Sequence, residues 1–336
     1  MFRLLKQNQK LVLILLIFIS FAYLLAIADR APLHLEKNCP CIHFKADVSS
    51  YINGIIHTTS PGPYVYRIFI PYLAIGLYNI VPSLSLVDID LILKILFIFL
   101  SQLTLYLYLR NFFRPIYSLL GVFILDILLS FTFSSILGPS IGENADLFNL
   151  IIFILALNAI YKNSFYLLLA ILFIGTFNRE TTIFLLPILF INDYTKRMNI
   201  YRSILACVVV AIPYFGLRFI IQSPEPNWLT FEGLIKNIPF LNQETTMNAL
   251  MANIHTFFTL GALIVLSLTN FSKHPQFLRI AFSIVPLFIL LHYIFGSVIE
   301  TRLWIPLFAI LIPLSIDTIN ILVQVEPNAL TRANKS

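Results

Sequence analysis

Charged side chains are scarce in this chain of 336 residues: Asp, Glu, Lys and Arg together make up 11% of it. A soluble globular domain carries about 25%, whereas here the mean hydropathy is +0.88 and 59% of the residues are hydrophobic. This scarcity excludes a soluble globular protein. A helical membrane crossing takes about 20 residues, so only loops remain once the crossings are removed. We therefore expect no soluble catalytic domain.

Cysteine is also scarce, with only Cys39, Cys41 and Cys207. Cys207 lies in an apolar run, where packing is its expected role. A bridge between Cys39 and Cys41 would be strained, because a disulfide needs a Cα separation of about 4.4–6.8 Å. Two sulfurs alone also fall short of a structural zinc site. We therefore expect no functional role for this pair.

A basic domain that could read nucleic acid is missing too. The formal charge is +6, but Lys and Arg lie in short clusters beside apolar runs, where membrane orientation and anionic lipids account for them. Without a basic domain that carries a reading element, we expect no nucleic-acid partner. The chain also has no tandem repeat, low-complexity stretch or interdomain linker. Residues 1–336 are therefore predicted to form a single integral membrane domain.

What the chain does have is long apolar runs, which predict an all-α polytopic membrane helix bundle. We predict about ten transmembrane helices with both termini in the cytoplasm. The first run is longer than the roughly 7–15 residues of a signal-peptide core, so an uncleaved first helix is expected, although Ala26-Ile27-Ala28 resembles a cleavage site. The predicted spans are 11–28, 89–109, 116–137, 147–161, 165–178, 181–192, 203–221, 253–269, 280–298 and 303–323.

The outer side of the membrane is predicted to hold a long first loop at 29–88 and a further loop at 222–252. Within the first loop, the apolar segment 67–81 is predicted to be an interfacial helix that lies on or dips into the outer leaflet. If it crossed, every later basic cluster would be exported. The segments between 147 and 192 are short for full crossings, which suggests an outward cavity, because broken helices at membrane depth need cover from protein or water.

This threading places acidic and basic side chains on opposite sides of the membrane. Lys and Arg follow the positive-inside rule, in which carboxylates count for little. Chemistry at the outer face is therefore one candidate reason for the carboxylates to gather there. The basic residues expected inside are Arg3, Lys6, Lys10, Arg110, Arg114, Lys162, Lys196, Arg197, Arg202, Lys273, Arg279, Arg332 and Lys335. The acidic residues expected outside are Asp47, Asp88, Asp90, Glu143, Asp146, Glu180, Glu232, Glu244 and Glu300.

Two outer segments carry carboxylates at helical spacing. Asp47 and Tyr51 are four residues apart and would share one face of a helix, although a solvated loop carboxylate is the simpler interpretation of Asp47. Glu143 and Asp146 would lie in the first turn of a helix, where carboxylates suit the helix dipole. They could cap that helix, or they could hold a divalent cation that keeps several waters.

Two further outer segments combine arginine with glutamate. Asn178-Arg179-Glu180-Thr181-Thr182 lies between two apolar runs, and Glu300-Thr301-Arg302 lies between the last two predicted helices. Ionisable groups enclosed by apolar segments are functional candidates, because they are costly to bury. Arginine suits phosphate because its planar fork can bond two oxygens at once. A local salt bridge at a helix end is the alternative for each segment.

Together these segments resemble the GT-C superfamily of polytopic glycosyltransferases, which use polyprenyl-phosphate-linked sugars. Asp47 soon after the first helix, the 67–81 segment, and Glu143 with Asp146 match the acidic motifs and the interfacial helix of that superfamily. Arg179-Glu180 before an apolar run and the Glu-x-Arg of 300–302 are similar to patterns in uncharacterised bacterial members. The resemblance covers most of the chain and implies a plasma (inner) membrane location with the active face extracytoplasmic.

The resemblance also implies a mechanism and a set of partners. Asp47 would be the general base, a role worth roughly 10²–10⁴-fold in rate. The donor would be a polyprenyl-phosphate sugar held among membrane lipids, and the acceptor a glycan, lipid or protein of the envelope. No organic cofactor is expected, and Mg²⁺ or Mn²⁺ could bind at Glu143 and Asp146. The residues implied to bind the donor phosphate are Arg67, Arg179 and Arg302, and those implied to orient the acceptor are Glu143, Asp146, Glu180, Glu300 and Tyr51.

Other functions remain open at this point. A lipid-linked glycan flippase, polymerase or ligase would use the same outward cavity. A small-molecule transporter would place its binding groups near the midplane, often in inverted repeats, and the chain shows no such repeat. A non-enzymatic assembly partner is a further alternative. The position of the ionisable groups at the outer helix ends favours surface chemistry over translocation.

Overall fold

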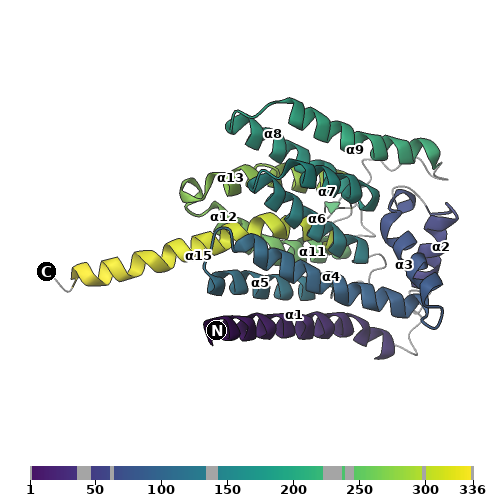
Figure 1. The fold of residues 1–336 in the computed structure, drawn as a ribbon, viewed down its shortest axis with the longest axis horizontal. Helices are drawn as coiled ribbons and strands as arrows, with labels where there is room; N and C mark the ends of the chain where they lie inside the picture. Colours follow the sequence, from purple (N-terminus) through teal and green to yellow (C-terminus); the bar gives the residue numbers. More distant parts are fainter. Residues whose placement is uncertain are drawn as a thin grey trace.

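The protein is helical throughout the part that its computed structural model describes, which is residues 2–35, 47–60, 64–133, 143–221, 237–238, 246–296 and 300–333. Within those ranges there is no β-strand, which confirms the predicted all-α class. Figure 1 shows the helices stacked side by side as a bundle, with α2 and α3 at one end. The principal α-helices are α1 (Phe2–Leu35), α2 (Asp47–Ile56), α3 (Phe69–Ile80), α4 (Leu86–Leu109), α5 (Pro115–Phe133), α6 (Glu143–Tyr161), α7 (Phe165–Asn178), α8 (Leu185–Thr195), α9 (Tyr201–Ile220), α11 (Thr246–Thr256), α12 (Ala262–Leu268), α13 (Gln276–Phe282), α14 (Val285–Phe295) and α15 (Ile305–Ala333).

Short turns of 3-10 or π type join several of these helices. The 3-10 turns are η2 (Tyr64–Tyr66), η3 (Glu180–Phe184), η5 (Phe271–Lys273) and η6 (Thr301–Trp304), and the π turn is η4 (Phe257–Gly261).

The described helices are apolar enough to mark a multi-pass membrane protein. Six stretches are long and apolar enough to cross a bilayer, namely 115–132, 143–161, 201–220, 250–268, 276–295 and 301–323. Shorter apolar helices occur at 12–28, 69–80 and 165–178. The larger predicted number, about ten crossings, therefore stays a prediction.

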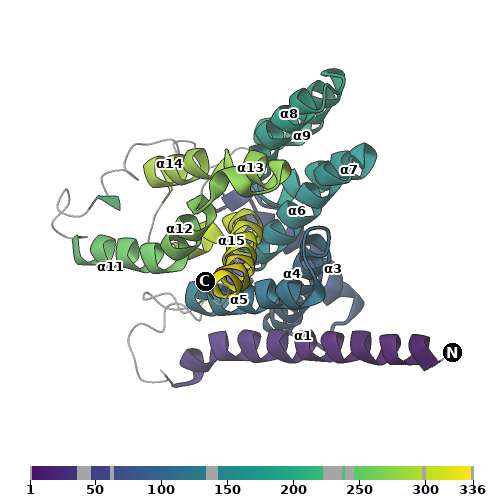
Figure 2. The same cartoon turned by 90° about the vertical axis from the view of Figure 1, so that its left-hand side faces the viewer.

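The centre of the bundle is formed by α6 and α15, which pack against each other, and α6 also packs against α4 and α7. Figure 2 shows α15 nearly end-on, with α4 and α5 on one side of it and α12 and α13 on another. The outer helix α9 presents large apolar side chains outward, including Phe215 and Phe219. Exposed apolar surface on this scale is unfavourable in water but suits lipid.

Several predicted segments keep their place but change their limits. The predicted 165–178 segment is α7, residue for residue. The predicted 280–298 span overlaps a candidate crossing at Gln276–Phe295, and residues 297 and 298 lie outside the described ranges. This crossing is built from two helices, α13 and α14, with Ser283 and Ile284 between them. The predicted 253–269 segment contains the end of α11, the π turn η4 and α12. Single apolar runs therefore did not guarantee single helices, because hydropathy does not report where the backbone bends.

The segment expected at 147–161 is longer than predicted. It begins at Glu143, so that α6 has 19 residues and is long enough to cross. Glu143 and Asp146 lie in its first turn, as their spacing indicated. Both side chains are buried and paired with cations. The helix can therefore include residues 143–146, which the hydropathy pattern did not count as part of the crossing.

Two helices form within the predicted first outer loop. The helix α3, at Phe69–Ile80, has 12 residues and is too short for a crossing of about 20. The helix α2 begins at Asp47 and contains Tyr51. The two residues therefore lie in one helix, as their shared face requires. The Asp47 side chain lies outside the described residues, as does most of the predicted 222–252 loop.

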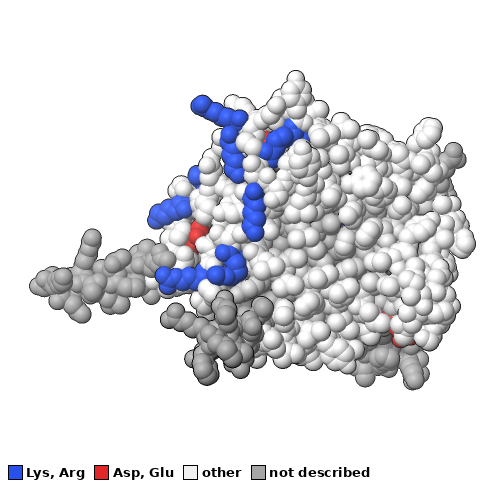
Figure 3. All heavy atoms as spheres, in the orientation of Figure 1, with Lys and Arg blue, Asp and Glu red and all other residues white. Residues whose placement is uncertain are grey.

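Charged side chains separate towards the two ends of the bundle. Figure 3 shows Lys and Arg gathered at the end opposite α2 and α3. This basic end contains the C-termini of α4, α6 and α8 and the N-termini of α5 and α9, with exposed Arg110, Arg114, Lys162, Lys196 and Arg197. The N-termini of α4 and α6, together with η3 and η6, lie at the other end.

Candidate functional site

Three arginines that are far apart in sequence come together at the end opposite the basic end. Arg67 precedes α3, Arg179 follows α7, and Arg302 lies in η6. Carboxylates from α6, η3 and the residue before η6 lie among them. We call the set formed by Arg67, Arg179, Arg302, Asp146, Glu180 and Glu300 the arginine–carboxylate network.

The end of α7 is shaped to carry Arg179 inward. Arg179 has an extended backbone, with φ −152° and ψ 141°, and its N–H donates to the Gly175 carbonyl at 2.9 Å. Asn178 donates from Nδ2 to the Ala145 carbonyl of α6 at 2.8 Å. A Cβ on Gly175 would meet Ile152 Cγ2 at 2.7 Å, so glycine permits the close approach of α7 to α6. The polar segment is thereby fixed against the first turn of α6.

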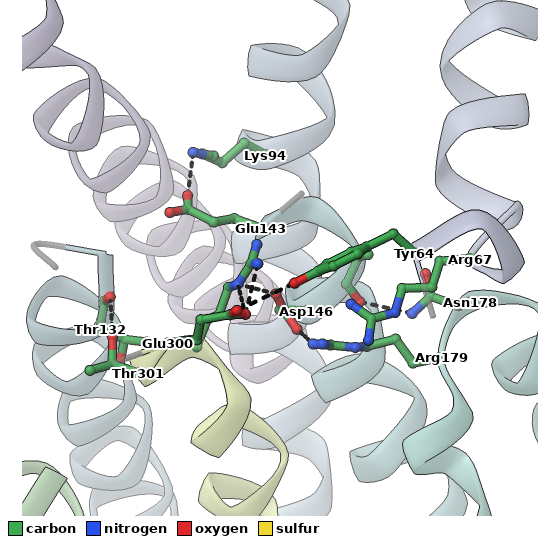
Figure 4. Close-up of polar contacts among 12 residues, drawn as sticks. Tyr64, Arg67, Lys94, Thr132, Glu143, Asp146, Asn178, Arg179, Glu300 and Thr301 are labelled. Carbon is green, nitrogen blue, oxygen red and sulfur yellow. Dashed lines mark hydrogen bonds and ion pairs between the residues drawn. The ribbon is translucent and has the colours of Figure 1, made fainter. Parts of the chain in front are cut away.

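Asp146 is the most enclosed carboxylate of the network. It is paired with the Arg179 guanidinium, and its Oδ2 lies 3.7 Å from Arg302 Nε. Figure 4 shows Arg179 directed at Asp146 from the side opposite Glu143. Burial, and next the charge of Arg67, lower the pKa of Arg179 to about 9, so that the guanidinium stays protonated at neutral pH. One carboxylate therefore serves two cations.

Glu180 holds Arg67 with two hydrogen bonds. Arg67 donates from Nη2 to Glu180 Oε1 at 2.7 Å and from Nε to Oε2 at 3.4 Å. Burial acts to raise the pKa of Glu180, but the charges of Arg67 and Arg179 outweigh it and lower that pKa to about 2. Burial likewise opposes the charged form of Arg67, and Glu180 more than compensates and raises its pKa. Both partners are therefore ionised.

Glu300 joins Arg302 to the segment before α3. Arg302 donates to Glu300 Oε2 from Nη2 at 2.9 Å and from Nε at 3.3 Å. The Tyr64 hydroxyl donates to Glu300 Oε1 at 3.3 Å, and the Arg67 guanidinium lies 4.8 Å from the centre of the Tyr64 ring. Burial would raise the pKa of Glu300, but Arg302 lowers it below its ordinary value. The local salt bridge considered for residues 300–302 is present, and it is one link of a larger network.

Tyr51 lies within electrostatic reach of the same cations. Burial raises the pKa of its hydroxyl, while the charges of Arg67, Arg302 and Arg179 act in the opposite direction. Tyr51 of α2, a predicted site residue, therefore interacts electrostatically with the three arginines of the network.

Glu143 has a different partner, which the sequence did not suggest. Lys94 of α4 donates to Glu143 Oε2 at 2.7 Å, and both side chains are buried. Asn144 donates from Nδ2 to Asp90 Oδ1 at 2.5 Å, which adds a second link between α4 and α6. Lys94 was missed because it lies inside the predicted 89–109 span. The sequence could nonetheless have indicated it, since a lysine within an apolar span is a candidate functional residue.

Asp88 caps the start of α4, whereas the nearby Asp90 accepts the hydrogen bond from Asn144. Ser85 and Asp88 form a reciprocal capping box, in which the Asp88 N–H donates to Ser85 Oγ and the Ser85 N–H donates to Asp88 Oδ2. Asp88 therefore satisfies the helix start and takes no part in the network.

The proposed metal ligands are placed against different cations. Glu143 faces Lys94 and Asp146 faces Arg179. Within the described ranges, no group of three or more His, Cys, Asp or Glu residues is placed to hold a metal ion. Binding of Mg²⁺ or Mn²⁺ at these two carboxylates stays a prediction, and it would require the metal to displace a cationic side chain.

No protein-family model, curated protein or solved structure matches the chain. Its class is therefore defined by its own fold and site. It is a multi-pass helical membrane protein with three arginines paired with carboxylates at one end of the bundle. Arg67, Arg179 and Asp146 are buried, and the other members of the network are partly buried.

Proposed function

We propose that this chain is a membrane glycosyltransferase that moves a sugar from a polyprenyl-phosphate donor to an envelope acceptor. The observation that carries the proposal is the convergence of Arg67, Arg179 and Arg302 beside Asp146, Glu180 and Glu300. Guanidinium forks match phosphate oxygens, and carboxylates and tyrosines suit sugar hydroxyls as hydrogen-bond partners. The network therefore offers both kinds of contact that a phosphosugar requires.

The charge separation supports an orientation. The exposed Lys and Arg of the basic end would face the cytoplasm under the positive-inside rule. The arginine–carboxylate network would then lie on the extracytoplasmic face of the plasma membrane. In this arrangement about ten helices cross, both termini are cytoplasmic, and α3 lies in the outer leaflet. The lipid tail of the donor would remain in the bilayer while its phosphate reached the network.

The reaction is a single displacement at the anomeric carbon. Asp47 takes the proton of the acceptor hydroxyl while that oxygen forms a bond to the anomeric carbon. The bond from this carbon to the phosphate oxygen breaks, and its electron pair leaves with the polyprenyl phosphate. The arginines stabilise the charge that develops on the phosphate, which is most effective in a water-poor site. The configuration at the anomeric carbon is inverted.

The remaining polar residues would orient the acceptor. Tyr51 interacts electrostatically with the three arginines and would contact a sugar beside the phosphate. Glu143 and Glu180 would accept hydrogen bonds from hydroxyl groups, at the expense of part of their contact with Lys94 and Arg67.

The test uses the purified full chain in lipid with polyprenyl-phosphate sugars and an extract of envelope acceptors. Sugar released from the lipid would be followed for wild type, Asp47→Asn, Arg179→Lys and the control Arg114→Gln, which removes an exposed arginine from the basic end. Donor consumption that is lost in Asp47→Asn and Arg179→Lys but kept in Arg114→Gln supports the transferase. Equal turnover by Asp47→Asn and wild type would remove Asp47 as the base. Uptake of intact donor across the membrane without sugar release would favour a flippase.

A further inference from the structure

The arginine–carboxylate network is balanced in formal charge. The three guanidiniums of Arg67, Arg179 and Arg302 are each paired with a carboxylate. A phosphate ester that entered without any other change would leave the site with excess negative charge in a buried environment, which is costly. Binding of an anion is therefore easiest if one resident carboxylate leaves its arginine.

The three carboxylates differ in how readily they can leave. The Asp146 side chain is 2% exposed and lies between two arginines, whereas Glu180 is 22% exposed and Glu300 is 32% exposed. Glu180 is held by two hydrogen bonds from Arg67, a residue of a different segment. Glu300 is bound to Arg302, only two residues away. Among the described residues, its one hydrogen bond with a distant segment is the 3.3 Å bond from the neutral Tyr64 hydroxyl, so it gives up less than Glu180 when it leaves.

We propose that the Glu300 carboxylate is an exchangeable counter-ion that occupies the phosphate position on Arg302 and is displaced when a phosphate-bearing lipid binds. This inference rests on the proposed function, since it takes the network as the phosphate site. One carboxylate oxygen, Glu300 Oε2, accepts from both Nε and Nη2 of Arg302. It therefore occupies the guanidinium fork that a phosphate oxygen would use. The Tyr64 hydroxyl, which donates to Glu300, would be available to the incoming phosphate.

If Glu300 is an exchangeable counter-ion, its removal should change anion binding in the opposite direction from the removal of a carboxylate that binds the acceptor. If Glu300 competes with phosphate, its removal strengthens anion binding, because the ligand no longer has to displace a negative charge. If Glu300 instead binds or orients the ligand, its removal weakens binding or leaves it unchanged. A substitution at one residue therefore separates the two roles.

The experiment measures binding of a short-chain prenyl monophosphate, and separately of inorganic phosphate, to the purified full chain in detergent. The proteins are wild type, Glu300→Gln, Arg302→Gln, the double variant of residues 300 and 302, and Arg179→Lys. We expect Glu300→Gln to bind the prenyl phosphate about tenfold more tightly and Arg302→Gln to bind it more weakly. The double variant should show no gain over Arg302→Gln. A parallel gain for inorganic phosphate would show that the headgroup alone is recognised, and a gain confined to the prenyl phosphate would show that the tail contributes.

Failure of this inference is distinguishable from failure of the proposed function. Weaker binding by Arg302→Gln with no gain in Glu300→Gln would overturn the exchange and leave the phosphate site standing. Equal binding by wild type, Arg302→Gln and Arg179→Lys would overturn the phosphate site itself. Glu300→Ala serves as a second variant if Glu300→Gln does not fold, and the same gain is expected of it.

Discussion

The two ends of the bundle hold their charged side chains in different ways. At the basic end, Arg110, Arg114 and Lys162 are exposed, whereas at the other end Arg67 and Arg179 are buried and paired with carboxylates. Exposed charges contribute little to stability, and those at the basic end are explained by orientation in a membrane. Buried charges must offset a large desolvation cost, which is why the arginine–carboxylate network is a candidate functional site.

The largest effect is expected from breaking the most buried pair. Asp146→Asn would leave Arg179 without its carboxylate and weaken the support of Arg302. Removal of one partner of a buried ion pair costs about 3–5 kcal/mol. Unfolding by denaturant in detergent would measure the loss, with Lys162→Gln at the basic end as the control. Equal stability of the two variants would show that the buried pair stabilises the fold no more than an exposed lysine of the basic end does.

The buried link between α4 and α6 gives the next largest effect. Lys94→Met leaves Glu143 buried without its cation, and Glu143→Gln leaves Lys94 without its anion. Each single change should destabilise the protein by about 3 kcal/mol. The double variant should lose about 1–3 kcal/mol less than the sum of the two single changes, because no charge is left unpaired. Additive losses measured in the same unfolding assay would show that the two side chains act independently.

The close approach of α7 to α6 is tested by a smaller change. Gly175→Ala would place Cβ 2.7 Å from Ile152 Cγ2 and 2.9 Å from Thr182 Oγ1, and such overpacking costs about 1–3 kcal/mol. Gly216→Ala is the matched control, since nothing lies within 4 Å of its Cβ. That change should stabilise α9 by up to about 1 kcal/mol, because alanine favours helices over glycine. Thermal unfolding should move in opposite directions for the two variants.

The effect confined to the narrowest range of conditions is a dependence of stability on acid. The folded-state pKa of Glu180 is about 2, below its ordinary value of 4.5, so the unfolded state binds the proton more readily. The stabilisation by ionised Glu180 is therefore complete above the ordinary pKa and is lost as the pH falls from about 4.5 towards about 2. Glu300 contributes in the same direction. A Glu180→Gln variant should unfold with a flatter pH profile across this window, whereas an unchanged profile would remove Glu180 as its source.

Much of the candidate site was predictable one segment at a time. The helical first turn with Glu143 and Asp146 follows from spacing, and the limits of α7 follow from the apolar run that ends at Asn178. The partners of these residues were not predictable. Glu143 pairs with Lys94, 49 residues away, and Arg67 donates to Glu180 across 113 residues.

The order of residues along the chain was enough to predict that the chain is helical and apolar and that most of its charges lie near helix ends. These properties depend on the hydropathy and spacing of residues that are close along the chain. The shared site of three arginines from three segments, and the pairing of Lys94 with Glu143, became visible only in the folded bundle. Those pairings depend on which helix ends pack together, and packing is set by contacts over the whole bundle.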